Sequence, residues 1–72
     1  MKLFIFKTDI DTEQKVSLVN KLFQTDRNII DISIDIEDVD NVLRLETTDG
    51  INEFEIVSRV QNKGFSCVEL AD

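Results

Sequence analysis

The sequence predicts an α+β domain in which two helices cover one face of a four-stranded antiparallel sheet. Two observations lead to this fold class. Four segments have the apolar runs or strict alternation that are typical of strands, and two segments between them repeat apolar residues at the three- and four-residue spacing of helices. Together they follow the order strand, helix, strand, strand, helix, strand, which predicts a two-layer domain.

The first half of the chain contains three of these elements. Residues 3–6 are apolar on both faces, as in a central strand. Either Asp11 or Thr12 can cap the helix that follows, and Gln14 stands three residues after Asp11, as in a capping box. Residues 30–36 then alternate isoleucine with polar residues without interruption, which predicts a strand buried on one face only.

The second half contains the other three elements. Residues 37–41 have the composition of a turn and residues 42–46 alternate again, so these residues and the preceding strand are predicted to form a hairpin. Asn52, with a glutamate three residues later, begins the second helix, and Gly64 suits the left-handed residue that ends it. Residues 65–70 are predicted to form the last strand.

Few sheet topologies can connect strands and helices in this order. With right-handed crossovers, the simplest solution is an antiparallel sheet in spatial order 4-1-3-2 with both helices on one face. That arrangement is the ferredoxin-like fold, which carries many unrelated functions. We expect residues 1–72 to form this one domain, because a chain of this length has no room for a second core.

Composition excludes several classes of function. The chain has 15 acidic and eight basic residues, with a net charge of -7, so it repels nucleic acids and anionic membranes. The N-terminal apolar run is too short for a signal peptide or a membrane span, and one cysteine fits a reducing compartment, so we expect a cytoplasmic protein. With no histidine and no base near Cys67 in sequence, we expect neither catalysis nor a cofactor.

Four segments lie where this fold places its first loop, its second and third strands and its second helix: FKTDIDTEQKV, IIDISIDI, VLRLETT and INEFEIVSRVQNKGF. Together they resemble the heavy-metal-associated domain family of small copper chaperones and P-type ATPase metal-binding domains, over almost the whole chain. The resemblance implies that Ile10 matches a methionine of the metal loop, and that Thr12 and Lys15 match the two cysteines of its CxxC motif. In that family the position of Phe65 packs beside the loop, but an aromatic residue at the start of a strand is usually a core residue, and we expect this for Phe65.

The replaced cysteines argue against transport of soft metals. Ions such as Cu(I) are held by thiolate or thioether sulfur. Thr12 offers only a hydroxyl, and Lys15 places a positive charge where the ion would sit. We therefore predict that the chain keeps the scaffold and acts as a non-catalytic interaction domain, with a second copy or another protein as its partner.

Two alternatives remain open. In the first loop, Asp9, Asp11 and Glu13 supply the carboxylates that hard cations such as Ca²⁺ prefer, although acids at the start of a helix ordinarily complement its N-H groups and dipole. The other alternative is a small-molecule regulatory domain of the ACT type. Such domains bind their ligands at a first loop with glycine or proline, and neither residue is present in this loop.

The sheet face away from the helices is the last candidate site. If the two phenylalanines of residues 3–6 point toward the helices, the residues between them point outward. A contiguous apolar group on adjacent strands indicates an interface, although a register error of one residue would reverse the assignment. On this basis five side chains are predicted to line the open face: Leu3, Ile5, Val42, Val68 and Leu70.

Overall fold

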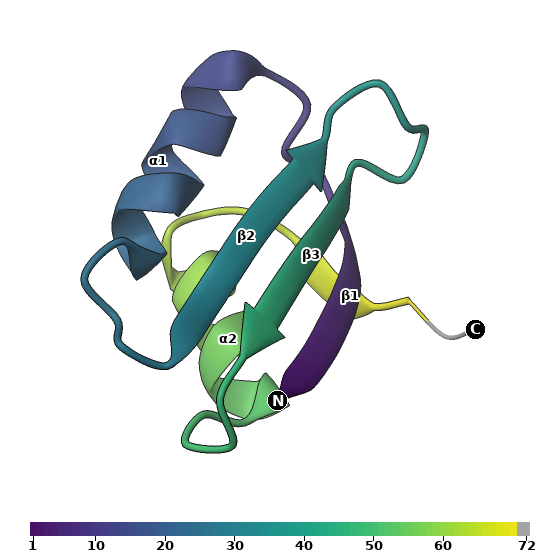
Figure 1. Ribbon diagram of the computed structural model, residues 1–72. Helices are drawn as coiled ribbons and strands as arrows, with labels where there is room; N and C mark the ends of the chain where they lie inside the picture. The colour runs from purple at the N-terminus through teal and green to yellow at the C-terminus, as the bar shows by residue number, and fades with distance from the viewer. Residues whose placement is uncertain (71–72) are drawn as a thin grey trace.

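The computed structural model describes residues 1–70 and has the predicted order of elements. They are β1 (Lys2–Thr8), α1 (Glu13–Phe23), β2 (Ile29–Asp35), β3 (Val42–Thr47), α2 (Glu53–Asn62) and β4 (Cys67–Glu69). All four strands form one antiparallel sheet in the order β2-β3-β1-β4, which is the predicted 4-1-3-2 order read from the other edge. Both helices lie on one side of the sheet (Figure 1). The ferredoxin-like fold is therefore confirmed.

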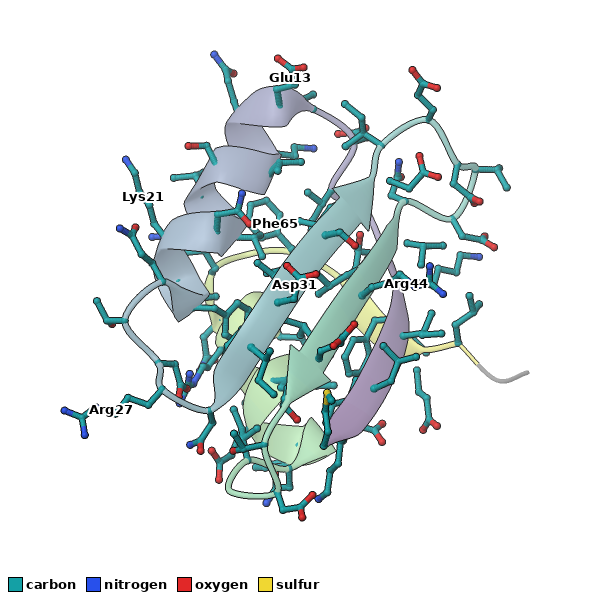
Figure 2. The ribbon with its side chains drawn as sticks, viewed as in Figure 1. Glu13, Lys21, Arg27, Asp31, Arg44 and Phe65 are labelled. Atoms are coloured by element: carbon teal, nitrogen blue, oxygen red, sulfur yellow. The ribbon has the colours of Figure 1, made fainter. Side chains whose placement is uncertain are left out.

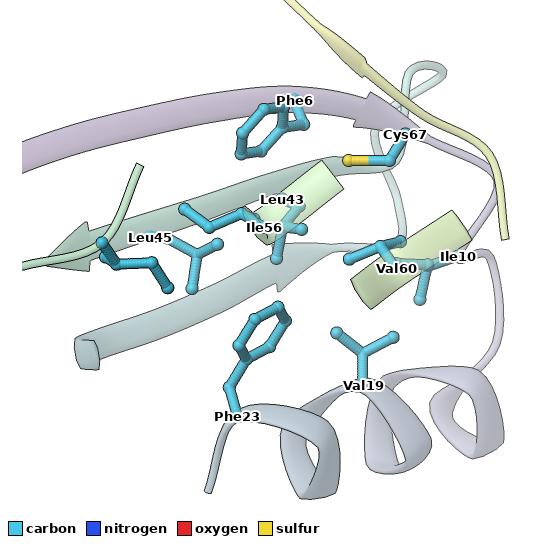
Figure 3. Close-up of a cluster of buried hydrophobic side chains, with 10 residues drawn as sticks. Phe6, Ile10, Val19, Phe23, Leu43, Leu45, Ile56, Val60 and Cys67 are labelled. Carbon is cyan, nitrogen blue, oxygen red and sulfur yellow. The ribbon is translucent and has the colours of Figure 1, made fainter. Parts of the chain in front are cut away.

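The core lies between the sheet and the helices (Figure 3). Phe6 of β1 and the two leucines of β3 are fully buried, and they meet apolar side chains from both helices. Burying one such side chain contributes about 1.5 to 3 kcal/mol, so this layer holds the fold together. The helix residues that complete the core are Val19, Phe23, Ile56 and Val60.

Within residues 1–70, neither helix is long or apolar enough to cross a membrane.

At its first residues, β2 differs from the strand that the sequence predicts. Ile29 pairs with Thr47 and Asp31 pairs with Glu46, so the register shifts between them and Ile30 is the extra residue of a bulge. Ile30 is 54% exposed, whereas Ile29 packs against the core. The expectation of unbroken alternation over residues 30–36 is wrong at this point, because a bulge reverses the face of the residues before it.

Both helices begin at capping side chains. The Thr12 hydroxyl accepts a hydrogen bond from the Lys15 backbone N-H at 3.2 Å, so Thr12 is the cap of α1. Asp11 does not cap, and Gln14 therefore does not take the third position of a capping box. At α2 the prediction is confirmed, because Asn52 Oδ1 accepts the N-H of the third helical residue at 2.9 Å.

The C-terminal end of α2 explains why β4 is shorter than predicted. Gly64 has a φ of 100°, the left-handed conformation that ends many helices. The backbone N-H of Phe65 still donates to the Val60 carbonyl of α2 at 3.3 Å. Phe65 therefore belongs to the helix cap, the N-H of Ser66 donates to Asp9 Oδ1, and the strand covers Cys67–Glu69 instead of residues 65–70.

Candidate functional site

The first loop, residues 9–12, is held by its own side chains. Ile10 is fully buried in the core, and the Thr12 hydroxyl is occupied as the cap of α1. The Lys15 ammonium lies 2.8 Å from Asp11 Oδ1 and 3.5 Å from the Asp9 carbonyl oxygen. A cation of the protein itself therefore binds two of the oxygen atoms that this loop would offer to a metal.

The three carboxylates around this loop do not converge. Asp9 Oδ1 accepts the backbone N-H of Ser66 at 3.0 Å, which ties the loop to the segment before β4. The hydrogen bond between Asp11 and Lys15 lowers the pKa of Asp11 and raises the pKa of Lys15. Glu13 is exposed in the first turn of α1. In the described part of the chain, no three Asp, Glu, Cys or His side chains are grouped as metal ligands.

Cys67 and Phe65 face the core rather than a ligand. Cys67 is 2% exposed and lies among apolar side chains (Figure 3). Burial, together with the negative charge of Glu53, raises the pKa of the Cys67 thiol to about 11. Because the thiolate is the nucleophile and the soft-metal ligand, this sulfur is unreactive near neutral pH. Phe65 is half-buried and packs against the same core.

The open face of the sheet presents apolar side chains from neighbouring strands. Leu3 is 56% exposed and Val68 is 61% exposed, while Ile5 is half-buried. Cross-strand partners point to the same side of a sheet, so Leu3 and Ile5 share this face with Glu46 and Arg44. The half-buried Val42 and Leu70 occupy the positions of β3 and the end of β4 that alternation assigns to this side.

Charged residues on the same face were not singled out from the sequence. Asp31 of β2 and Arg44 of β3 lie in front of the sheet (Figure 2). Two open hollows adjoin Arg44, and both lack the enclosure of a small-molecule site. The polar positions of the alternating strands were the signal that could have identified these residues. One hollow is lined by Ile5, Ser33, Ile34, Asp35, Asp38, Val42 and Arg44, and the other by Leu3, Asp31, Ser33, Arg44 and Glu46.

No protein-family profile and no curated protein matches this sequence. Among solved structures, a yeast copper transporter domain is similar over 100% of this chain and 99% of its own, with a TM-score of 0.84 and 15% identity. A copper-binding domain from a P-type ATPase covers 99% of this chain and 96% of its own, with a TM-score of 0.84 and 14% identity. The chain has the fold of a heavy-metal-associated domain. A third structure, the CsoZ metallochaperone, has a TM-score of 0.79 and 19% identity, over 93% of this chain and 96% of its own.

This heavy-metal-associated fold offers two surfaces of different character. In the first loop, Lys15 and the backbone N-H of Ser66 bind oxygen atoms of Asp9 and Asp11. On the open sheet face, by contrast, Asp31, Arg44 and Glu46 take part in none of the ion pairs formed within residues 1–70. The open face therefore combines exposed apolar side chains with charged side chains that form no ion pair within residues 1–70, whereas Asp11 of the loop is paired with Lys15.

Proposed function

We propose that this chain is a non-catalytic interaction domain on the heavy-metal-associated fold, and that it does not carry soft metals. The observation behind this proposal is the bonding of Lys15 to Asp11 and to the Asp9 carbonyl in the first loop. An incoming metal ion would be repelled by the ammonium group and would have to break these bonds. The Thr12 hydroxyl, at the position that the resemblance matches to the first cysteine, already caps α1.

The absence of catalysis is supported by the chemistry of the side chains. The sequence has no histidine, and its one cysteine is the buried Cys67. Catalytic acids and bases are usually found in clefts, where burial and neighbouring charges tune their pKa values. Asp11 in the first loop and Glu13 in the first turn of α1 are instead exposed.

Contact with a partner is proposed for the open sheet face. Exposed apolar side chains on adjacent strands are typical of interaction surfaces, whereas isolated ones need no explanation. Leu3 and Val68 are the most exposed apolar residues of this face. The partner is either a second copy of the chain or another protein.

Metal binding can be tested by thermal unfolding of the reduced protein with Cu(I), Zn²⁺, Ca²⁺ or EDTA. We expect no change in the midpoint, because only a ligand that binds the folded state raises it. The matched control is the double variant Thr12→Cys, Lys15→Cys, which places two thiols at the CxxC spacing, at the cap and in the first turn of α1. At a Cu(I) concentration of about 100 Kd, its stability should rise by about 2.7 kcal/mol relative to the metal-free variant.

The outcome that contradicts this part of the proposal is a Cu(I)-specific rise in the midpoint of the unsubstituted chain. A rise with Ca²⁺ alone would favour the carboxylates of the first loop instead.

The interaction surface can be tested by site-specific photo-cross-linking in the cells that produce the protein. A photoreactive residue at position 3 or 68 should give defined cross-linked products. The control is position 18, because Leu18 is also an exposed apolar residue, at 43%, but lies on α1. Equal cross-linking at all three positions, or at position 18 alone, would contradict an interface on the open face.

A further inference from the structure

Three strands place their side chains in rows across the open face. Leu3, Glu46 and Asp31 form one row, because Glu46 pairs with both of the others. In the next row, Arg44 pairs with Ile5 on one side and with Ser33 on the other. An apolar side chain of β1 therefore begins each row, and charged or polar side chains of β3 and β2 continue it.

The first row contains two like charges directly across from each other. Glu46 and Asp31 are paired on antiparallel strands, where opposite side chains have Cβ atoms about 4.5 to 5.5 Å apart and like charges destabilise the sheet. Neither carboxylate has a cation within 4 Å in residues 1–70, although Arg44 occupies the adjacent row. A positive group from outside the chain would relieve this repulsion.

A second acidic position lies at the other end of β2. Asp35 and Asp38 line a hollow with Ile5 and Val42, on the far side of Arg44 from the first row, and the Oδ1 atom of each also accepts backbone N-H groups of the turn after β2. Because Asp31 and Asp35 are four residues apart on one strand, the two acidic positions are separated by about 13 Å. Arg44 lines the hollow at each of the two acidic positions, and its positive charge opposes a third cation between them.

We infer that the open sheet face binds an extended protein segment with lysine or arginine at positions i and i+4 and a non-basic residue at i+2. Side chains at these positions of a strand point to one side and repeat at the spacing of the two acidic positions. The net charge of -7 attracts such a segment and opposes the approach of a second copy of this chain. This inference rests on the proposed function as an interaction domain.

The probe for this inference is the acetylated and amidated peptide TKTSTKT, which has lysines at the required spacing. Its isomer TKTKTST has the same composition and charge, but places one lysine where Arg44 repels it. Titration of the ¹⁵N-labelled protein at low salt should shift the amide resonances of Asp31, Ser33 and Arg44. We expect the affinity for TKTSTKT to be at least about threefold higher than the affinity for the isomer, as for charge pairs at the exposed rim of an interface.

Two double variants with equal net charge separate local from general attraction. Asp31→Asn with Glu46→Gln removes the acidic pair, and we expect it to weaken binding of TKTSTKT about fivefold. Because neither carboxylate takes part in the ion pairs formed within residues 1–70, this variant should fold, which its amide spectrum will show. Glu13→Gln with Glu55→Gln removes two exposed acids of the helices and should leave binding unchanged.

Several results would overturn the inference. They are equal affinity for the two peptides, equal weakening by the two variants, binding of TETSTET as tight as that of TKTSTKT, or shifts confined to the helices and the first loop. If TKTSTKT fails to bind while positions 3 and 68 still cross-link, the interaction function stands and the basic pattern of the partner is wrong.

Discussion

At the scale of single residues, Arg59 connects parts of the fold that are distant in sequence. Its guanidinium reaches from α2 to the carboxylate of Asp26, in the loop after α1, and lies 5.8 Å from the centre of the Phe23 ring. Asp26 also accepts the backbone N-H of Asn28 at 2.8 Å. This backbone hydrogen bond, and then the bond to Arg59, lower the pKa of Asp26. The ionised form of this side chain therefore stabilises the loop.

We predict that Asp26→Asn lowers the free energy of unfolding at pH 7 by about 1 to 2 kcal/mol, since it weakens charge-assisted hydrogen bonds at a partly exposed site. The folded pKa is below the unfolded value, so the contribution is present above the unfolded pKa, near 3.8, and is lost as the pH falls through the folded pKa. Urea unfolding at pH 7 and pH 3 should show a smaller difference between the two proteins at pH 3.

The control for this experiment is Asp49→Asn, because Asp49 pairs only with the exposed amino terminus of Met1 at 3.7 Å and is itself 79% exposed. It should change stability by less than about 0.5 kcal/mol at either pH. A loss at Asp26 that is equal at both pH values would mean that its charge is unimportant.

At the scale of elements, β2 shows how pairing can override a sequence pattern. The alternation of residues 30–36 predicts that Ile30 and Ile32 are equivalent, whereas the bulge exposes Ile30 and leaves Ile32 packed against the core. The existence and type of all six elements follow from local periodicity and capping. The bulge depends on pairing with β3, and residues of another strand do not enter the local pattern of β2.

Substitutions of Ile30 and Ile32 test whether the two residues are equivalent, as unbroken alternation predicts, or differ in burial, as the bulge requires. We predict that Ile30→Thr changes the free energy of unfolding by less than about 0.5 kcal/mol, as for most surface substitutions. By contrast, Ile32→Thr should lower it by about 1 to 3 kcal/mol, because it removes apolar contacts from a half-buried position. Chemical unfolding of the two variants tests this, and similar losses would show that Ile30 is also packed.

At the scale of the whole molecule, excess negative charge is the main electrostatic feature. The net charge is -7, and two of the acids, Asp31 and Glu46, lie directly opposite each other on the open face. The site on the open sheet face could be predicted only in part from the sequence. Its apolar half follows from strand alternation, but the rows of charge depend on the register between β2 and β3, which alternation within one strand does not specify.

We predict that salt stabilises this protein. Raising the ionic strength from about 0.01 to 1 M shortens the Debye length from about 30 to 3 Å, which screens repulsion among the acidic residues. The thermal midpoint should therefore rise in NaCl. The same rise is expected in choline chloride, because screening does not depend on the identity of the cation. A rise in only one of the salts would indicate a bound ion rather than screening.

The sequence by itself determined the order of elements, the sheet topology, the cap and the glycine end of α2, and the lack of sulfur ligands at the first loop. These depend on neighbouring residues and on the few topologies that allow right-handed crossovers. Only the tertiary structure decided that Thr12 rather than Asp11 caps α1, that Lys15 binds Asp11 Oδ1 and the Asp9 carbonyl oxygen, and that Asp31 faces Glu46. These features depend on the three-dimensional course of the backbone, which brings the interacting groups within reach of each other.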